Sequence, residues 1–136
     1  MRNLAHTLRL AAASLLVLTA CAGAQAPAST PELWQKIQSA NTDLSCDDSS
    51  QCHSIGVGSK ACGGPENYIA WSSKNGDGAQ LKALVEQHSA ARRADDKRQG
   101  MMSTCSVVSD PGATCRAGIC VINPRSVASP GQPGSK

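Results

Sequence analysis

Aromatic side chains are almost absent from this chain of 136 residues, which has no Phe, one Tyr and two Trp. Aromatic rings supply a large part of the buried apolar area in most protein cores, so their scarcity predicts a small hydrophobic core. Exported domains with small cores usually need covalent cross-links to stay folded. The first question is therefore whether this chain is exported and what cross-links it.

The chain also lacks an apolar run long enough to cross a bilayer. Its longest run, Leu10–Ala20, has 11 residues and follows Arg2 and Arg9, whereas a spanning helix needs about 20. A positive start followed by a short apolar stretch and small residues is the pattern of a secretory signal peptide. We therefore assign residues 1–20 to a signal peptide and exclude them from the fold.

Two cleavage patterns overlap just after this run. Ala22-Gly23-Ala24 fits an ordinary signal-peptidase site, whose use would release a periplasmic or secreted chain beginning at Gln25. Leu18-Thr19-Ala20-Cys21 resembles the lipobox of bacterial lipoproteins at all four positions. That resemblance implies a lipid on the Cys21 thiol and a mature chain that begins there. In the Gram-negative lipoproteins that this stretch resembles, a residue other than Asp after the cysteine, here Ala22, implies export to the outer membrane rather than retention in the inner membrane.

No excess charge of either sign marks the body of the chain. The whole sequence carries 13 Lys and Arg against 10 Asp and Glu, but the segment from Cys46 to Cys120 has eight of each. A neutral body lacks the basic footprint by which proteins bind nucleic acid. We therefore expect no nucleic-acid partner, and we interpret the basic cluster Arg92–Arg98 as a solvated helix face.

Cysteine, in contrast, is plentiful, with seven residues. Apart from Cys21, an even number remains in a chain predicted to be exported, which predicts three disulfides. The six are Cys46, Cys52, Cys62, Cys105, Cys115 and Cys120, and the pairing we expect is Cys46–Cys120, Cys52–Cys62 and Cys105–Cys115. Metal binding is the alternative, with His53 as the best candidate ligand. The cysteine spacings differ from those of the common zinc motifs, so we expect no metal and no cofactor.

The region between residues 30 and 123 contains sequence signals for two helices. Thr30-Pro31-Glu32 is a helix start, because Thr can cap, Pro suits the first turn and Glu favours the positive end of a helix. This helix is predicted to end before Asn41. Apolar residues at three- and four-residue steps predict a long helix over residues 78–99, capped by Asp77 and ended by Gly100.

Strand signals are shorter. Apolar runs predict strands over residues 53–58, 68–72 and 103–109, and a hairpin over 113–122 with its tip at Ala117-Gly118. The predicted fold class is α+β: a small disulfide-stabilised domain with one long helix packed on a few short antiparallel strands. This domain covers residues 30–123, between a flexible tether at 21–29 that starts at the lipidated cysteine and a disordered tail at 124–136.

Residues suited to catalysis are few. His53 and His88 are the histidines outside the leader, and His88 falls on the apolar face of the long helix, where a packed histidine is expected. With the cysteines assigned to disulfides, no thiol remains as a nucleophile. We therefore predict that the protein is not an enzyme, an enzyme of unknown class being the remote alternative.

The most distinctive segment of the body is Lys60-Ala-Cys-Gly-Gly-Pro65. One interpretation is a structural turn, in which the glycines adopt conformations closed to other residues. The other is a recognition loop formed by Lys60, Gly63, Gly64 and Pro65. In that case Lys60 would enter the acidic pocket of a protease, and the prior ordering of the loop would improve affinity.

The order of cysteines from Cys46 to Cys120 resembles that of small cysteine-rich proteins of bacterial envelopes, at the level of spacing. With the leader, it predicts a non-catalytic, membrane-anchored envelope lipoprotein with a binding or structural role. The expected partners are a membrane, through the lipid, and an envelope protein or a protease. A protease inhibitor acting through the loop around Lys60 is the alternative function.

Overall fold

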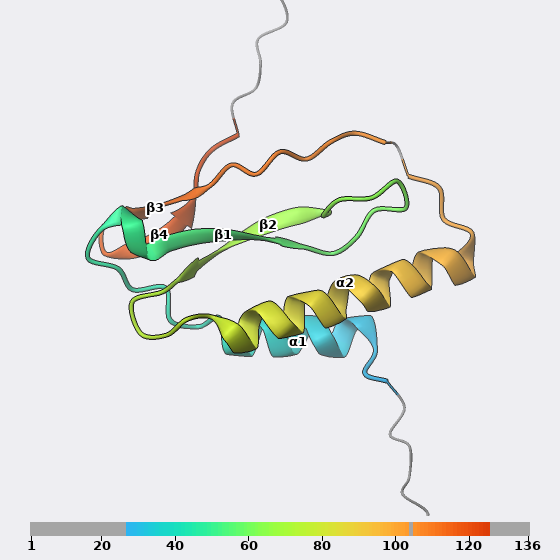
Figure 1. The fold of residues 1–136 in the computed structure, drawn as a ribbon, viewed down its shortest axis with the longest axis horizontal. Coiled ribbons are helices and arrows are strands. Elements are labelled where there is room, and N and C mark those ends of the chain that lie inside the picture. The colour runs from blue at the N-terminus through green and yellow to red at the C-terminus, as the bar shows by residue number, and fades with distance from the viewer. Residues whose placement is uncertain (1–26, 104, 126–136) are drawn as a thin grey trace, which may run out of the picture.

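The structure is a computed structural model that describes residues 27–103 and 105–125 (Figure 1). The predicted signal peptide, Cys21 and the tether as far as residue 26 lie outside the described residues, as does the predicted tail from residue 126 onward. Within the described part, no helix is both long enough and apolar enough to cross a membrane.

The predicted α+β class is confirmed. Two helices run in opposite directions along one side of an antiparallel hairpin, and a second, smaller hairpin lies at one end (Figure 1). The helical elements are α1 (Thr30–Ala40), η1 (Ser49–Gln51) and α2 (Ala79–Gln99). The strands are β1 (Cys52–Val57), β2 (Asn67–Ser72), β3 (Ala113–Arg116) and β4 (Ile119–Ile122), paired as β1–β2 and β3–β4.

The β1–β2 hairpin forms the middle of three layers. Side chains alternate between its two faces, as in any strand. On the helix face, Trp71 and Val57 join Ile37, Leu81 and Val85 in one core cluster. The opposite face contributes to a second, cysteine-rich cluster made of Cys46, Cys52, Ala70 and Cys120. The scarcity of rings is thus met by two small cores in place of one large core.

Residues 105–112, which we call the strap, run over the outer face of the β1–β2 hairpin (Figure 1). The predicted strand at 103–109 is wrong, because the described residues of that range form no ladder. The strap is held by side chains instead: the Tyr68 hydroxyl donates to the Val108 carbonyl at 3.4 Å, and Ser54 donates to Asp110 at 2.5 Å. It crosses a face of the hairpin, where no free strand edge is available for pairing.

Both long helices begin and end close to the predicted residues. The cap of α1 is Ser29, and not Thr30, and the Glu32 carboxylate accepts from the Ser29 amide and hydroxyl at 2.8 Å each. The cap of α2 is Gly78, and not Asp77, although the Asp77 carboxylate still accepts from an amide of the first turn. Gly100, at φ +61°, ends α2 as predicted.

The six cysteines form three disulfides, as predicted, but the predicted pairing is wrong. The bonds are Cys46–Cys115, Cys52–Cys120 and Cys62–Cys105, in place of Cys46–Cys120, Cys52–Cys62 and Cys105–Cys115. Cys115 and Cys120 lie opposite each other in the β3–β4 hairpin. That hairpin folds back on the start of β1, so its two cysteines bond separate partners there. Cys105 lies in the strap and bonds the loop between β1 and β2.

Candidate functional site

The loop between β1 and β2, which sequence reasoning singled out, is a tightly closed turn. The Lys60 amide donates to the Gly64 carbonyl at 3.0 Å, and the Gly63 amide donates to the Lys60 carbonyl at 2.9 Å. Gly63 and Gly64 have φ values of +94° and +77°, which favour glycine. Pro65 packs so closely on Gly56 that a β-carbon there would lie 2.9 Å from the proline ring. The disulfide to the strap makes this loop rigid.

The side chain of Lys60 is engaged within the protein. Its Nζ donates to the Ser106 carbonyl at 2.6 Å and lies 3.3 Å from the Ser106 hydroxyl. The ammonium group therefore helps to hold the strap against the loop. A lysine that enters a protease pocket must instead point outward, so this contact supports the structural interpretation of Lys60.

A shallow depression of about 450 Å³ opens between this loop and the last turns of α2. Three cations line it, Lys60 from the loop and Arg93 and Lys97 from α2, with one carboxylate, Asp96. Met101, just after the helix, forms part of its wall. Positive charge and an apolar wall are thus combined in one hollow.

The ionised groups around this depression differ in how far they are neutralised. The Glu66 carboxylate accepts from Arg92 Nε at 3.0 Å, and this hydrogen bond raises the pKa of Arg92. Arg92 also lies 3.8 Å from Asp96, and Arg98 pairs with Asp95. The pairing of Arg92 with Asp96 was foreseeable from their four-residue spacing.

Arg93 and Lys97, in contrast, make no ion pair with any described residue. Both are exposed, and they stand four residues apart on one face of α2, where like charges repel by tenths of a kcal/mol. The sequence carried a signal for this pair: the i, i+4 series Ser89, Arg93, Lys97, Met101 contains no acid.

His53, the candidate metal ligand, is used in packing. Its ring lies 4.6 Å from the Trp71 ring, centroid to centroid, and its Nε2 lies 3.0 Å from the Ser73 hydroxyl. That hydroxyl also donates to the Gln51 carbonyl at 3.2 Å. This Ser–His contact thus joins the end of β2 to the start of β1.

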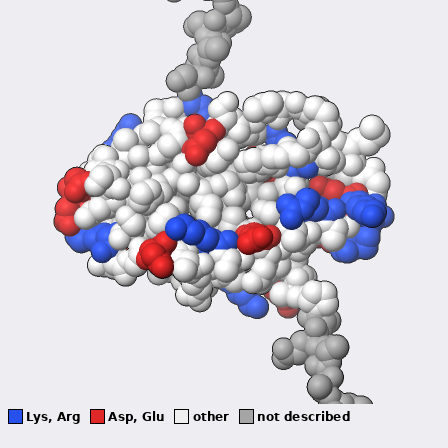
Figure 2. All heavy atoms as spheres, in the orientation of Figure 1, with Lys and Arg blue, Asp and Glu red and all other residues white. Residues whose placement is uncertain are grey.

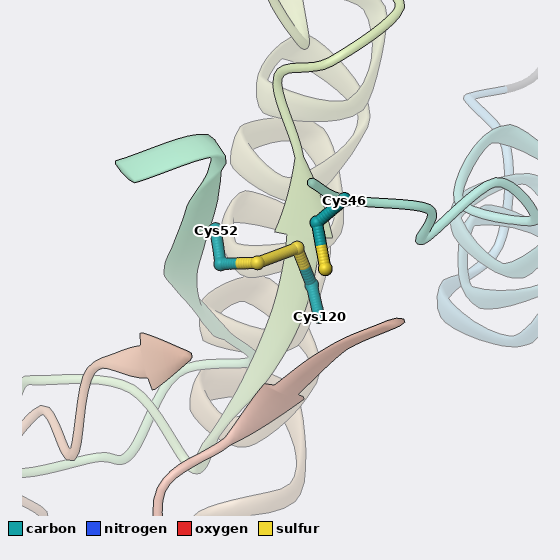
Figure 3. Close-up of side chains that lie close together, drawn as sticks. All are labelled: Cys46, Cys52 and Cys120. Atoms are coloured by element: carbon teal, nitrogen blue, oxygen red, sulfur yellow. A yellow bond between two sulfur atoms is a disulfide. The ribbon is translucent and has the colours of Figure 1, made fainter. Parts of the chain in front are cut away.

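Three sulfur atoms, those of Cys46, Cys52 and Cys120, lie within 4.8 Å of one another in the second core cluster (Figure 3). All three residues are buried. Cysteine binds a metal as a thiolate, and here each sulfur already belongs to a disulfide. The oxidised chain therefore uses this cluster as a covalent core.

His88 occupies the apolar face of α2, as its position in the sequence predicts. It is 6% exposed, and its ring centroid lies 5.8 Å from that of Trp34 in α1. Among the buried side-chain nitrogen and oxygen atoms of the described residues, His88 Nδ1 is the one without a hydrogen-bond partner. Burial lowers the pKa of His88, an effect that nearby Glu66 opposes and Arg92 reinforces.

Fold and site together define a small α+β domain stapled by three disulfides, with a rigid loop and a cationic, partly apolar hollow at one end. Comparison of the chain with models of known families, with curated proteins and with solved structures finds no match.

Proposed function

We propose that this protein is a non-catalytic lipoprotein of the bacterial envelope, anchored through Cys21 and presenting its disulfide-stapled domain as a binding or structural module. The observation that carries the proposal is the second core cluster. Three of its four buried members are cysteines, and together with Cys115, which packs against the cluster, they form the disulfides Cys46–Cys115 and Cys52–Cys120. Disulfides in a core form in an oxidising compartment, which supports export.

Within the exported classes, the lipobox-like stretch Leu18-Thr19-Ala20-Cys21 favours the anchored form. A single acyl chain holds a protein at a membrane only marginally, whereas two or more anchor it firmly. The diacylated lipoprotein anchor that the resemblance implies meets that requirement. Between Cys21 and α1 there are only eight residues, Ala22–Ser29, so the domain would stay close to the bilayer.

The proposal is tested by labelling cells with a fatty-acid analogue and following the protein through fractionation. We expect the label to be on the protein and the protein to be in the membrane fraction. Cys21→Ala is the matched control, which leaves the domain intact and should move the protein, unlabelled, to the soluble fraction when the membranes are washed at high salt. Wild-type protein that is soluble and unlabelled would refute the anchor.

A protease inhibitor is the second candidate, favoured by the rigidity of the loop around Lys60. The contact between Lys60 Nζ and Ser106 opposes it. We expect the folded domain to leave a trypsin-like protease uninhibited and Lys60→Ala to change nothing in that assay. A tight complex that is lost on this single substitution would establish the inhibitor in place of the module.

A further inference from the structure

Three features lie together at one end of the molecule. The start of α1 lies against the last turns of α2, where the Thr30 hydroxyl donates to Asp95 at 2.6 Å. The cationic hollow opens at the same end of α2. The two residues after Gly100, Met101 and Met102, are 55% and 93% exposed. The chain that leads back to Cys21 thus enters the domain at the same end of the molecule as these cations and exposed apolar side chains.

We propose that this end of the molecule, formed by Arg93, Lys97, Met101 and Met102, rests on the surface of an anionic lipid bilayer. The proposal builds on the anchored function above: the lipid on Cys21 would hold the protein at the membrane, and this surface would set its orientation there.

The charges fit an anionic headgroup. Arg93 and Lys97 repel each other across one helical turn and have no acidic partner among the described residues. A phosphate between them would relieve that repulsion, and Lys60, whose ammonium is held by Ser106, also lines the same hollow. Asp96, the one carboxylate in the lining, already faces Arg92. The hollow therefore offers net positive charge to a ligand.

The methionines fit the layer beneath the headgroups. Met101 and Met102 are among the few large apolar side chains that the described surface exposes. Methionine is unbranched and adapts its shape to irregular apolar surroundings. Peripheral proteins commonly combine such side chains with Lys and Arg, so that the apolar atoms enter the acyl boundary while the cations meet phosphate.

The distribution of charge over the molecule agrees with this orientation. Figure 2 shows Lys and Arg side chains gathered at the end where α2 finishes. Charge elsewhere is more balanced: Asp48 caps η1, and the neighbouring Asp47 pairs with Lys74 at 2.8 Å. A protein tethered next to its basic end would present that end to an anionic surface, because electrostatic attraction favours that pose.

A bilayer fits these features better than a nucleic acid does. Nucleic-acid binding draws its affinity from many phosphate contacts along an extended basic surface. Here two unpaired cations stand beside two methionines, within a body of balanced charge. A small cationic hollow with an apolar edge matches one headgroup and its neighbouring chains.

The test uses the Cys21→Ala protein prepared from the periplasm, which carries no lipid of its own. Its sedimentation is measured with vesicles of equal parts phosphatidylglycerol and phosphatidylcholine, and with vesicles of phosphatidylcholine alone. We expect binding to the anionic vesicles and loss of that binding at high salt. Each surface cation contributes about fivefold to such binding, so R93Q/K97Q should bind about 25-fold more weakly.

The matched control is K74Q/R116Q, which removes the same charge from the opposite end and should bind within about twofold of the parent. M101S/M102S should also bind more weakly than the parent. The proposal is overturned if R93Q/K97Q binds like the control, if M101S/M102S is unchanged, or if inorganic phosphate at millimolar concentration abolishes binding at constant ionic strength. Because this protein is unlipidated, the outcome is independent of whether Cys21 is acylated in cells.

Discussion

At the scale of single residues, His88 carries the clearest consequence of burial. The ring is nearly enclosed between α2 and α1, against Trp34, and its Nδ1 has no partner among the described residues. A charged imidazole in that position would lose its hydration without gaining a hydrogen bond at Nδ1. The neutral form is therefore favoured in the folded state, and the pKa of His88 is lowered by burial.

This lowered pKa predicts a loss of stability in mild acid. The unfolded chain takes up the proton near the ordinary histidine pKa of about 6.5, and the folded chain only at lower pH. The contribution of neutral His88 to the free energy of unfolding should therefore be complete above about pH 6.5. It should decrease as the pH drops toward the pKa of His88 in the folded state. Urea unfolding between about pH 7.5 and 5.5 measures the slope.

The variant His88→Leu should lack this slope, because no group at that position titrates. His53→Gln is the matched control and should keep the slope of the parent protein. A slope that survives in His88→Leu would show that another group is responsible.

Gly78 predicts a second effect at the residue scale. Its φ is +69°, and a β-carbon there would lie 2.6 Å from Cζ3 of the buried Trp71 ring. Gly78→Ala should therefore lower the free energy of unfolding by about 2 kcal/mol, through backbone strain and displacement of the ring. Gly76→Ala is the control, since a β-carbon there meets open space, and it should change stability by less than about 0.5 kcal/mol. Equal effects from the two substitutions would contradict the close packing on Trp71.

At the scale of elements, both helices, the strands β1 and β2 and the β3–β4 hairpin could be predicted. Their signals are local: the apolar spacing of α2, its stop at Gly100, and the tip at Ala117-Gly118 lie within each element. The strap could not be predicted, because its apolar residues Val107 and Val108 read like a strand. Whether such a segment pairs depends on whether a strand edge lies beside it, which is a property of the tertiary fold.

The disulfide pairing could not be predicted from the sequence for a related reason. Cys46–Cys115 and Cys52–Cys120, whose partners are 69 and 68 residues apart in the sequence, are set by the return of the β3–β4 hairpin to the start of β1. This return is held by the Cys120 amide, which donates to the Leu44 carbonyl at 2.8 Å, and by the Cys46 amide, which donates to the Gly118 carbonyl at 2.9 Å. None of these long-range bonds leaves a periodic signal in the sequence.

The three disulfides should differ in how easily they are reduced. Cys62 and Cys105 are both exposed, whereas Cys46, Cys52 and Cys120 are buried. Mild reduction without denaturant should therefore open Cys62–Cys105 first, because a thiol reagent must reach the sulfur it attacks. Alkylation followed by peptide mapping identifies the bond that opens, and initial loss of Cys52–Cys120 would contradict the described burial.

Cysteine-to-alanine pairs extend this prediction to stability. C62A/C105A removes a bond across 43 residues and should cost up to about 4 kcal/mol through loop entropy while leaving both cores in place. C52A/C120A removes a bond across 68 residues together with core packing, and it should cost more because the loop is longer and the core loses contacts. Thermal unfolding of the two variants side by side decides the order.

At the scale of the whole molecule, the antiparallel packing of α1 on α2 places the entry of the chain at the same end as the cationic hollow. The sequence showed the basic cluster and the leader separately, but Thr30 and Asp95 meet only through this packing. The hollow itself needs Lys60 from one loop and Arg93 and Lys97 from the helix. The candidate surface therefore could not be predicted from the sequence. Its two basic residues without an acidic neighbour, Arg93 and Lys97 on one face of α2, could be predicted.

The intact mass of the mature protein, purified from cell membranes without reduction, tests the anchored, disulfide-stapled lipoprotein most directly. We predict a chain that begins at Cys21, carries the mass of its lipid, and lacks six hydrogens because three disulfides are closed. Reduction should add those six hydrogens and leave the lipid in place. A lipid-free chain that begins at Gln25, or a lipidated chain with free thiols at the six domain cysteines, would contradict it.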